Sequence, residues 1–234
     1  TAAFAEAGQW SETLGASNQW RLRAPGDTLG PDVMIGVSYL GMGRPDDTLA
    51  HIKPYLNQAA IDPDHFESVI VLYAQSEIAK GHSDTAEAKL WPLAKGSKHW
   101  LAIFMQIAGR EAPPAVADRW LKMAREELKG DLDLELAYVT AVSDFSRRTG
   151  DSKLMATAAE NLQKAVASDK DDPAKLSMGY FVLGMLQEGQ KAPDSAEASY
   201  RRAVALNPRL AQACNNLAMM LARRFGGEIV SVDS

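Results

Sequence analysis

Few residues of this sequence stand in a pattern that could carry out catalysis or hold a metal. The four histidines, His51, His65, His82 and His99, are widely separated, and none belongs to an HExxH zinc pair. We expect them to be exposed or half-exposed. Cys214 is the only cysteine, which excludes an intramolecular disulfide and a thiolate metal cluster. We expect a small buried thiol there rather than a nucleophile.

Two short segments resemble ligand loops but lack the residues that those loops need. The segment "GDLDLE" lacks the glycine that a calcium loop needs at its sixth position, and Val142 stands where the bidentate acid belongs. We therefore expect Asp131 or Asp133 to cap a helix. The segment "GMGR" (41–44) follows a helix and lacks a third glycine, which predicts a turn and not a dinucleotide loop. With no P-loop and no GxSxG, we expect no active site, no metal and no cofactor.

The bulk composition is that of an ordinary globular chain. Its 234 residues can bury a large core, in one domain or two, and 46% of them are hydrophobic. A net charge of −5 gives no reason to expect nucleic acid or an anionic membrane as a partner. No apolar run is long enough to predict membrane insertion. The first residues do not resemble a signal peptide, and because no Met begins the chain we expect a fragment or a processed product. Cytoplasmic and exported locations both fit.

Turn-forming residues divide the chain into short helical segments. Pro, Gly, Asp and Ser cluster at intervals of roughly 12 to 20 residues, and each cluster combines a helix stop with a helix start. The only β-like run, "SVIVLYA" (68–74), lies within a longer pattern of helical spacing, in which Ile70, Tyr73, Ala74 and Ile78 form one face. The sequence therefore predicts an all-α protein.

A longer periodicity identifies the kind of helical protein. The segment 178–221 carries an aromatic residue, a Leu-Gly pair, Ala, a second aromatic, Ala and Pro at the offsets of the 34-residue tetratricopeptide repeat. These residues are Tyr180, Leu183, Gly184, Ala196, Tyr200, Ala203 and Pro208. The segment closely resembles that family, although Lys191 stands at the usual glycine position of the loop. The resemblance implies a right-handed α-solenoid of antiparallel helix pairs.

The resemblance extends over nearly all of the chain, and it is strongest over 178–221 and 26–56. We expect a single solenoid over residues 1–234, with about five complete helix pairs and partial units at 1–25 and 209–234. Expected second helices carry small and large apolar residues at matching positions. These are Ala86, Leu90 and Leu93; Ala117, Leu121 and Ala124; and Ala158, Leu162 and Ala165. The alternatives are an irregular helical bundle or another repeat type, such as Sel1-like or HEAT.

The resemblance also implies a concave groove lined by the first helix of each unit. The matching positions are unusually apolar, which favours a partner that presents hydrophobic side chains, either an amphipathic helix or an extended peptide. Alternatively, neighbouring units bury these residues as core. The positions are Val33, Val37, Leu40, Val71, Gln75, Ile78, Ala102, Gln106, Thr140, Asp144, Phe181, Met185, Asn215 and Met219.

Two polar arrangements in this groove are further candidates. Some members of the family hold a peptide's terminal carboxylate with Lys and Asn, and Asn215, with Asn216 beside it, matches one such position. The expected lysines are replaced by Met178, Phe181 and Val182. Three arginines near equivalent helix ends could form a basic row for acidic ligands, or could simply complement helix dipoles. They are Arg110, Arg148 and Arg223.

We therefore expect a non-enzymatic protein- or peptide-binding scaffold. The alternative is a substrate-positioning or assembly segment of a larger enzyme or secretion protein whose catalytic part lies outside this chain. A third possibility is self-association, because the expected first helix at 209–224 has no partner helix. Its apolar face would stay bare unless Ile229 and Val230 fold back onto it. The alanine-rich repeats with short loops resemble those of bacterial proteins.

Overall fold

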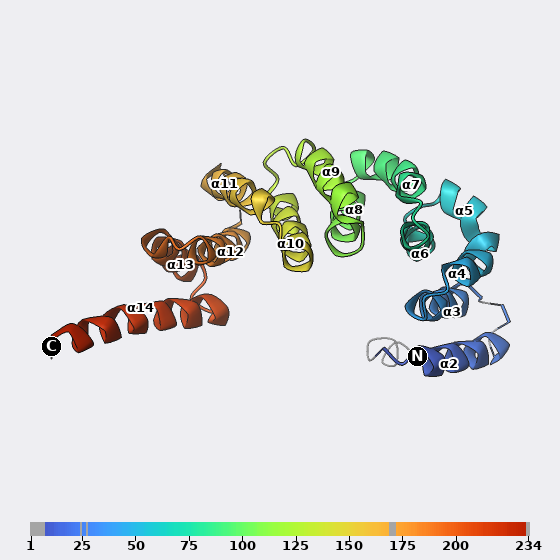
Figure 1. The fold of residues 1–234 in the computed structure, drawn as a ribbon, viewed down its shortest axis with the longest axis horizontal. Coiled ribbons are helices and arrows are strands. Elements are labelled where there is room, and N and C mark those ends of the chain that lie inside the picture. The colour runs from blue at the N-terminus through green and yellow to red at the C-terminus, as the bar shows by residue number, and fades with distance from the viewer. Residues whose placement is uncertain (1–7, 24, 27, 169–171, 233–234) are drawn as a thin grey trace. The chain divides into compact units, whose positions relative to one another are not determined.

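The computed structural model describes residues 8–23, 25–26, 28–168 and 172–232, and these residues contain helices but no strand (Figure 1). The all-α prediction is confirmed, and the β-like run 68–74 lies inside a helix. The helices are α2 (Trp10–Arg23), α3 (Leu29–Gly41), α4 (Pro45–Ile52), η1 (Lys53–Tyr55), α5 (Leu56–Ile61), α6 (Glu67–Ala79), α7 (Ser83–Gly96), α8 (Lys98–Arg110), α9 (Pro114–Arg125), α10 (Leu132–Thr149), α11 (Lys153–Ser168), α12 (Pro173–Gly189), α13 (Pro193–Leu206) and α14 (Ala211–Val232).

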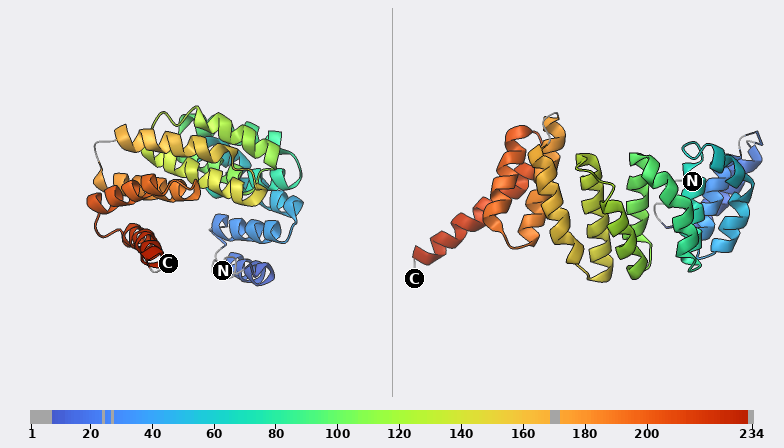
Figure 2. Two further views of the ribbon diagram at one scale, coloured as in Figure 1. Left: turned by 60° about the vertical axis from the view of Figure 1, so that its left-hand side comes forward. Right: turned by 90° about the horizontal axis from the view of Figure 1, so that it is seen from above.

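The chain forms two compact units, which are treated separately below. Unit 1 comprises Thr1–Ile107 and Glu111–Val116, and unit 2 comprises Ala108–Arg110 and Ala117–Ser234. In unit 1, α2 packs on α3, α3 on α4, and α6 on α4 and α7. In unit 2, each helix from α10 to α14 packs on the next one along the chain (Figure 2). Such sequential packing is the α-solenoid arrangement that the sequence predicts.

Polar contacts one repeat apart provide a second sign of this arrangement. In unit 1, the indole Nε1 of Trp100 donates to Asp64 Oδ1 at 2.7 Å, across 36 residues of sequence. In unit 2, Arg110 Nε donates to Asp144 Oδ2 at 2.8 Å, across 34 residues. These separations match the period of about 34 residues that the sequence pattern indicates. Equivalent positions of successive helix pairs are therefore neighbours within each unit.

The tetratricopeptide spacing in unit 2 has a direct packing explanation. Ala196, Tyr200 and Ala203 are fully buried on α13. A Cβ atom on Gly184 of α12 would lie 2.6 Å from Tyr200 Cδ1, closer than such contacts occur. Only glycine lets the Tyr200 ring lie against the backbone of α12, so the two antiparallel helices approach closely. The loop between them places Lys191 at a φ of 59°, the left-handed conformation for which the family uses glycine.

In unit 1, tryptophan rings of α2 pack against glycines of α3 in the same way. A Cβ on Gly30 would lie 2.8 Å from the Trp20 ring, and one on Gly41 would overlap the Trp10 ring. Because Trp10 begins α2 and Trp20 lies near its end, the two contacts fix the antiparallel register of α2 on α3. The partial unit at 1–25 stays a prediction, since residues 1–7 lie outside the described residues.

Helix ends follow the capping signals of the sequence. Asp131 Oδ1 accepts from the Leu134 backbone N–H at 3.1 Å, which confirms the capping role expected in "GDLDLE". Asp172 caps α12 in the same way. The segment "GMGR" forms a turn with Gly43 at a φ of 73°, as expected.

Two helices differ from the expected lengths. Pro54 interrupts the second helix of its pair, where α4 gives way to the short turn η1 and then α5, because proline lacks the N–H that a continuous helix needs. At the other end, α14 runs on to Val232. The backbone at Ile229 and Val230 thus belongs to this helix and does not form the fold-back that the sequence left open. No proline follows Pro208, so the helix continues through them.

Candidate functional site

The groove positions predicted in unit 1 are mostly half-buried. Ile78 is only 7% exposed, so its assignment to a groove surface is wrong. The helix α6 packs on α3, α4 and α7, and these neighbours leave little of its surface free. Gln75 Nε2 donates to Glu111 Oε1 at 2.7 Å, while Gln106 is exposed. The half-buried positions are Val33, Val37, Leu40, Val71, Gln75 and Ala102.

The charged positions predicted in unit 2 pair with one another. Asp144 accepts from Arg110 and Arg147. Arg148 Nε donates to the Gly109 carbonyl at 3.3 Å. Intramolecular contacts thus engage both arginines of the proposed basic row that lie here. Thr140 is exposed, with its hydroxyl bonded to the Leu136 carbonyl.

The third arginine of the row has a different setting. Arg223 lies well inside α14, so it does not stand at a helix end as the sequence spacing suggests. Its Nη1 donates to Glu188 Oε1, at the end of α12, at 3.2 Å. This ion pair links the two consecutive first helices of unit 2.

Apolar side chains near this ion pair are unusually exposed. Met178 and Met185 of α12 are 40% and 42% exposed, and Met219 of α14 is 48% exposed. Asn215, one turn before Met219, is also exposed, and its amide contacts the Met219 sulfur at 3.6 Å. Phe181 is half-buried because its ring packs on Tyr200, with centroids 6.1 Å apart.

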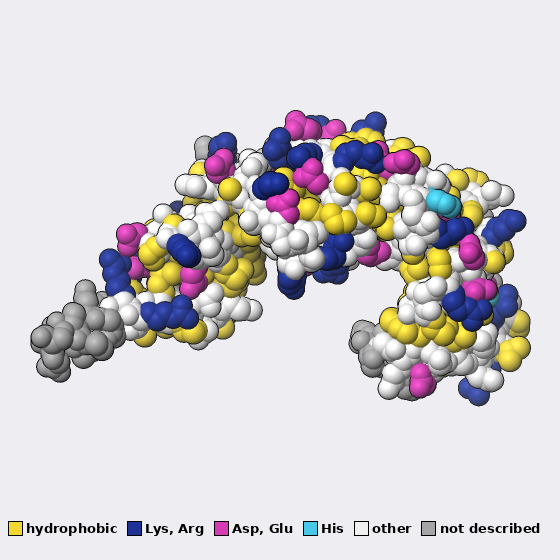
Figure 3. Space-filling view, in the orientation of Figure 1, with side chains coloured by type: hydrophobic (Ala, Val, Ile, Leu, Met, Phe, Trp, Pro, Cys, Tyr) yellow, Lys and Arg dark blue, Asp and Glu magenta, His cyan; other side chains and the backbone are white. Residues whose placement is uncertain are grey.

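Helix geometry brings these residues onto one surface. Met185 lies three residues before Glu188, and Met219 lies four residues before Arg223, so each methionine lies one turn from the ion pair on the same helix face. Figure 3 shows hydrophobic side chains gathered over α12. We call Met178, Met185, Asn215 and Met219 the methionine face. Three of its four members are groove positions predicted from the sequence.

The expected carboxylate clamp has little support in this geometry. Asn215 is exposed, but Asn216 turns toward α13, where its amide donates to the Tyr200 hydroxyl at 3.4 Å. Met178 is exposed where the family places a lysine. A carboxylate at Asn215 would therefore meet a thioether instead of an ammonium group.

A polar cluster in unit 1 was not predicted. Asp32 is 3% exposed and accepts from Arg21 Nε at 2.8 Å, His51 Nε2 at 2.9 Å and the Tyr55 hydroxyl at 2.5 Å. The Tyr55 hydroxyl also lies 2.7 Å from Thr28 Oγ1. Burial, and then the hydrogen bond to Asp32, raise the pKa of Tyr55. These residues lie in α2, at the start of α3, in α4 and in η1. Their spacings match no known motif, so the sequence did not predict the cluster.

The histidines and Cys214, which the sequence analysis also considered, lie in the following surroundings. The four histidines are exposed or half-buried, as expected. His82 lies 2.9 Å from Glu77, and His99 lies 2.6 Å from Glu67. Among the described residues, no three potential ligands cluster as a metal site would require. Cys214 is half-buried rather than buried, since the described part of the chain covers α14 mainly through α13.

In the described ranges, none of the helices combines the length and the hydropathy that crossing a bilayer requires.

The fold and surface together define the class of the molecule, an all-α helical-repeat protein. Neither the models of known protein families nor the sequences of characterised proteins match this chain. Among solved structures, the chain is similar to one in the crystal structure of the APC/C hetero-tetramer Cut9–Hcn1, with 17% identity and a TM-score of 0.42. The match covers 95% of this chain and 42% of that one, so this chain spans less than half of its neighbour's length. Nothing in these comparisons supports a bacterial origin.

Proposed function

We propose that this chain is a non-enzymatic scaffold of the tetratricopeptide type, and that unit 2 holds a protein or peptide partner on the methionine face. The observation that carries this proposal is the exposure of Met178, Met185 and Met219, at 40%, 42% and 48%. Large apolar side chains grouped on one surface favour association, because covering them removes apolar area from water.

Methionine suits such a surface for a chemical reason. Its unbranched, polarizable side chain adopts many shapes at little energetic cost, so one surface can fit several apolar partners. The methionines stand on two helices joined by the Glu188–Arg223 pair, which favours an elongated partner. An amphipathic helix or an extended peptide with apolar side chains has this form.

Charged pairs border the methionine face at both ends of α12. Lys175 Nζ donates to Asp133 Oδ2 at 2.6 Å, three residues before Met178. Glu188 pairs with Arg223 at the opposite end. An apolar centre with a polar border is the usual organisation of protein interfaces. The exposed Asn215 amide adds a donor and an acceptor for a partner's backbone.

A peptide selection tests this proposal. Peptides are selected from a random phage-displayed library on the whole chain, and their affinities are measured by isothermal titration calorimetry. We expect apolar peptides whose affinity falls at least tenfold in the double variant Met185→Lys, Met219→Lys, because two buried charges oppose docking. Leu22→Lys is the matched control, since Leu22 is 75% exposed but belongs to unit 1. A selection without binders, or equal losses in both variants, would contradict the proposal.

The alternative function, a substrate-positioning or assembly segment of a larger enzyme, uses the same surface and differs in what the partner is. Self-association through α14 is a separate proposal. Leu217 and Leu221 are half-buried on this helix. Light scattering of the parent chain and of Leu217→Lys, Leu221→Lys should show a concentration-dependent mass only in the parent. A parent that stays monomeric at high concentration would contradict it.

A further inference from the structure

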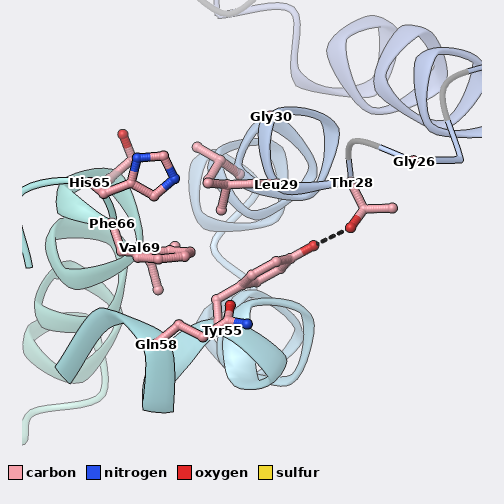
Figure 4. Close-up of a pocket in the computed structure, with 11 residues that line it drawn as sticks. Gly26, Thr28, Leu29, Gly30, Tyr55, Gln58, His65, Phe66 and Val69 are labelled. Atoms are coloured by element: carbon pink, nitrogen blue, oxygen red, sulfur yellow. Dashed lines mark hydrogen bonds between the residues drawn. The ribbon is translucent and has the colours of Figure 1, made fainter. Parts of the chain in front are cut away.

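Unit 1 contains a pocket that the proposed function does not use. Its volume is about 590 Å³, and it lies between the start of α3, the η1–α5 segment and the start of α6 (Figure 4). Sites for small organic molecules usually measure roughly 300 to 1,000 Å³. The pocket therefore has the size of a small-molecule site.

Two aromatic rings and several aliphatic side chains form part of the pocket wall. The rings of Tyr55 and Phe66 have centroids 6.4 Å apart and planes tilted by 31°. Leu29 and Val69 add aliphatic surface beside them, as Figure 4 shows. A flat ring placed against such walls gains both apolar burial and offset stacking.

The hydrogen bonds of the Tyr55 hydroxyl fix the ring. Its single proton goes to Asp32 Oδ2, at 2.5 Å, so Thr28 Oγ1 acts as the donor in the 2.7 Å contact with Tyr55. Asp32 is itself held by Arg21 and His51. The ring is thus preorganised, and Asp32 is a positioning residue for this wall.

The mouth of the pocket carries neutral polar groups. Gln58, His65 and Ser68 are exposed there, and in the described part of the chain their side chains make no hydrogen bond. The described residues that line the pocket include no Asp, Glu, Lys or Arg. Such a lining supplies hydrogen bonds without a full charge, which favours a neutral ligand.

We propose that this pocket binds a small neutral molecule with an aromatic ring and a hydrogen-bonding substituent, of the phenol or indole class. The ring lies against Tyr55 and Phe66, and the substituent meets Gln58, His65 or Ser68. The same chemistry occurs in free metabolites and in the tyrosine or tryptophan side chain of a peptide. This site is separate from the methionine face and stands independently of the function proposed above.

The test uses the whole chain and four defined probes. Saturation-transfer NMR and calorimetry are carried out with p-cresol, benzoate, benzylamine and N-acetyl-tyrosinamide. We expect p-cresol to bind with a dissociation constant of about 1 mM, the range reached by ligands of its size. Benzoate and benzylamine should bind at least fivefold more weakly, because the described lining offers no opposite charge.

Two matched variants locate the binding. Ser68→Phe places a ring in the mouth of the pocket, and Ser195→Phe makes the same change at an exposed serine in the first turn of α13. We expect Ser68→Phe to weaken p-cresol binding at least tenfold and Ser195→Phe to leave it unchanged. Circular dichroism confirms that both variants fold.

The outcomes separate the source of the ligand from the existence of the site. Binding of N-acetyl-tyrosinamide equal to that of p-cresol supports the site and assigns it to a peptide side chain. Exclusion of the larger probe supports the site and assigns it to a free molecule. No binding of p-cresol, binding that ignores Ser68→Phe, or tighter binding of either charged probe would overturn the proposal.

Discussion

Asp32 of unit 1 and Glu135 of unit 2 are deeply buried carboxyl groups in opposite surroundings. Asp32 of unit 1 is 3% exposed and accepts hydrogen bonds from Arg21, His51 and Tyr55. Glu135 of unit 2 is 4% exposed, and its Oε2 has no hydrogen-bond partner among the described residues. Burial of the Glu135 carboxyl, and then the nearby charge of Asp131, raise its pKa above the ordinary value.

The comparison shows that depth of burial does not decide what a buried acid does to stability. A carboxylate with several donors becomes a junction between helices, and removing it leaves those donors without an acceptor. A carboxyl without donors favours its neutral form and destabilises the fold when it ionises. Asp32 should therefore stabilise unit 1, whereas Glu135 should weaken unit 2 at neutral pH.

Two close-packed glycines, one in each unit, differ in what they touch. A Cβ on Gly41 would meet the Trp10 side chain. A Cβ on Gly109 would meet the backbone of Ala141, with Cα 3.0 Å away and the carbonyl oxygen nearer still. A side chain can rotate away from an added methyl group, but a helix backbone moves only with its whole helix.

The largest effect should come from Gly109→Ala. Because the added methyl group would collide with the Ala141 backbone, we expect a loss of roughly 3 kcal/mol in the free energy of unfolding of unit 2. Gly41→Ala is the control in unit 1, with an expected loss of about 1 kcal/mol, since the Trp10 ring can shift. Urea unfolding, with hydrogen exchange read separately in α3 and α10, measures both. Equal losses would show that the type of neighbour does not matter.

A somewhat smaller loss is expected from Asp32→Ala. The variant leaves His51 and Tyr55 without their shared acceptor, while the half-exposed Arg21 regains water. We expect unit 1 to lose about 2 kcal/mol, below the full value for breaking a buried ion pair. Hydrogen exchange should accelerate in α3 and stay unchanged in α10. Unchanged exchange in α3 would mean that the Asp32 cluster does not hold unit 1 together.

The repeat architecture and part of the candidate site were predictable from the sequence for a physical reason. Helix stops and the spacing of Gly184, Ala196 and Tyr200 are local signals, and each repeat contacts its neighbours in order. The same register placed Met185, Asn215 and Met219 on first helices. The assignment of Ile78 to the groove surface was wrong, because the repeat register does not indicate how closely neighbouring helices cover a position.

The Asp32 cluster and the neighbouring pocket were not predictable in this way. Arg21, Asp32, His51 and Tyr55 come from separate helices, and their meeting depends on where Pro54 breaks the second helix of the pair. The burial of Glu135 was not predictable either, because it follows from the packing of α10 rather than from any motif.

Glu135→Gln should stabilise unit 2 at neutral pH by roughly 1 kcal/mol, because a neutral amide replaces a buried carboxylate. The sign follows from proton binding. A pKa raised in the folded state means that the folded chain holds its proton more tightly, so stability is fully present below the ordinary value of 4.5 and is lost as pH rises through the folded pKa. The difference in urea midpoint between variant and parent should therefore grow with pH above 4.5. A difference that stays constant with pH would contradict this account.

The smallest effect should separate two tyrosines. Tyr138 of unit 2 is fully buried, its hydroxyl has no partner among the described residues, and burial raises its pKa to about 12. Tyr138→Phe removes a polar atom that folding has already stripped of water, so we expect a gain of about 0.5 kcal/mol. Tyr55→Phe, which deletes hydroxyl contacts to Asp32 and Thr28, should instead cost about 1 kcal/mol. Both changes remove one oxygen from a tyrosine, so composition and size are matched, and only the partners of the hydroxyl differ. Opposite signs in urea unfolding would extend the contrast between Asp32 and Glu135 to neutral groups, whereas a loss in both variants would show that the Tyr138 hydroxyl is satisfied in solution.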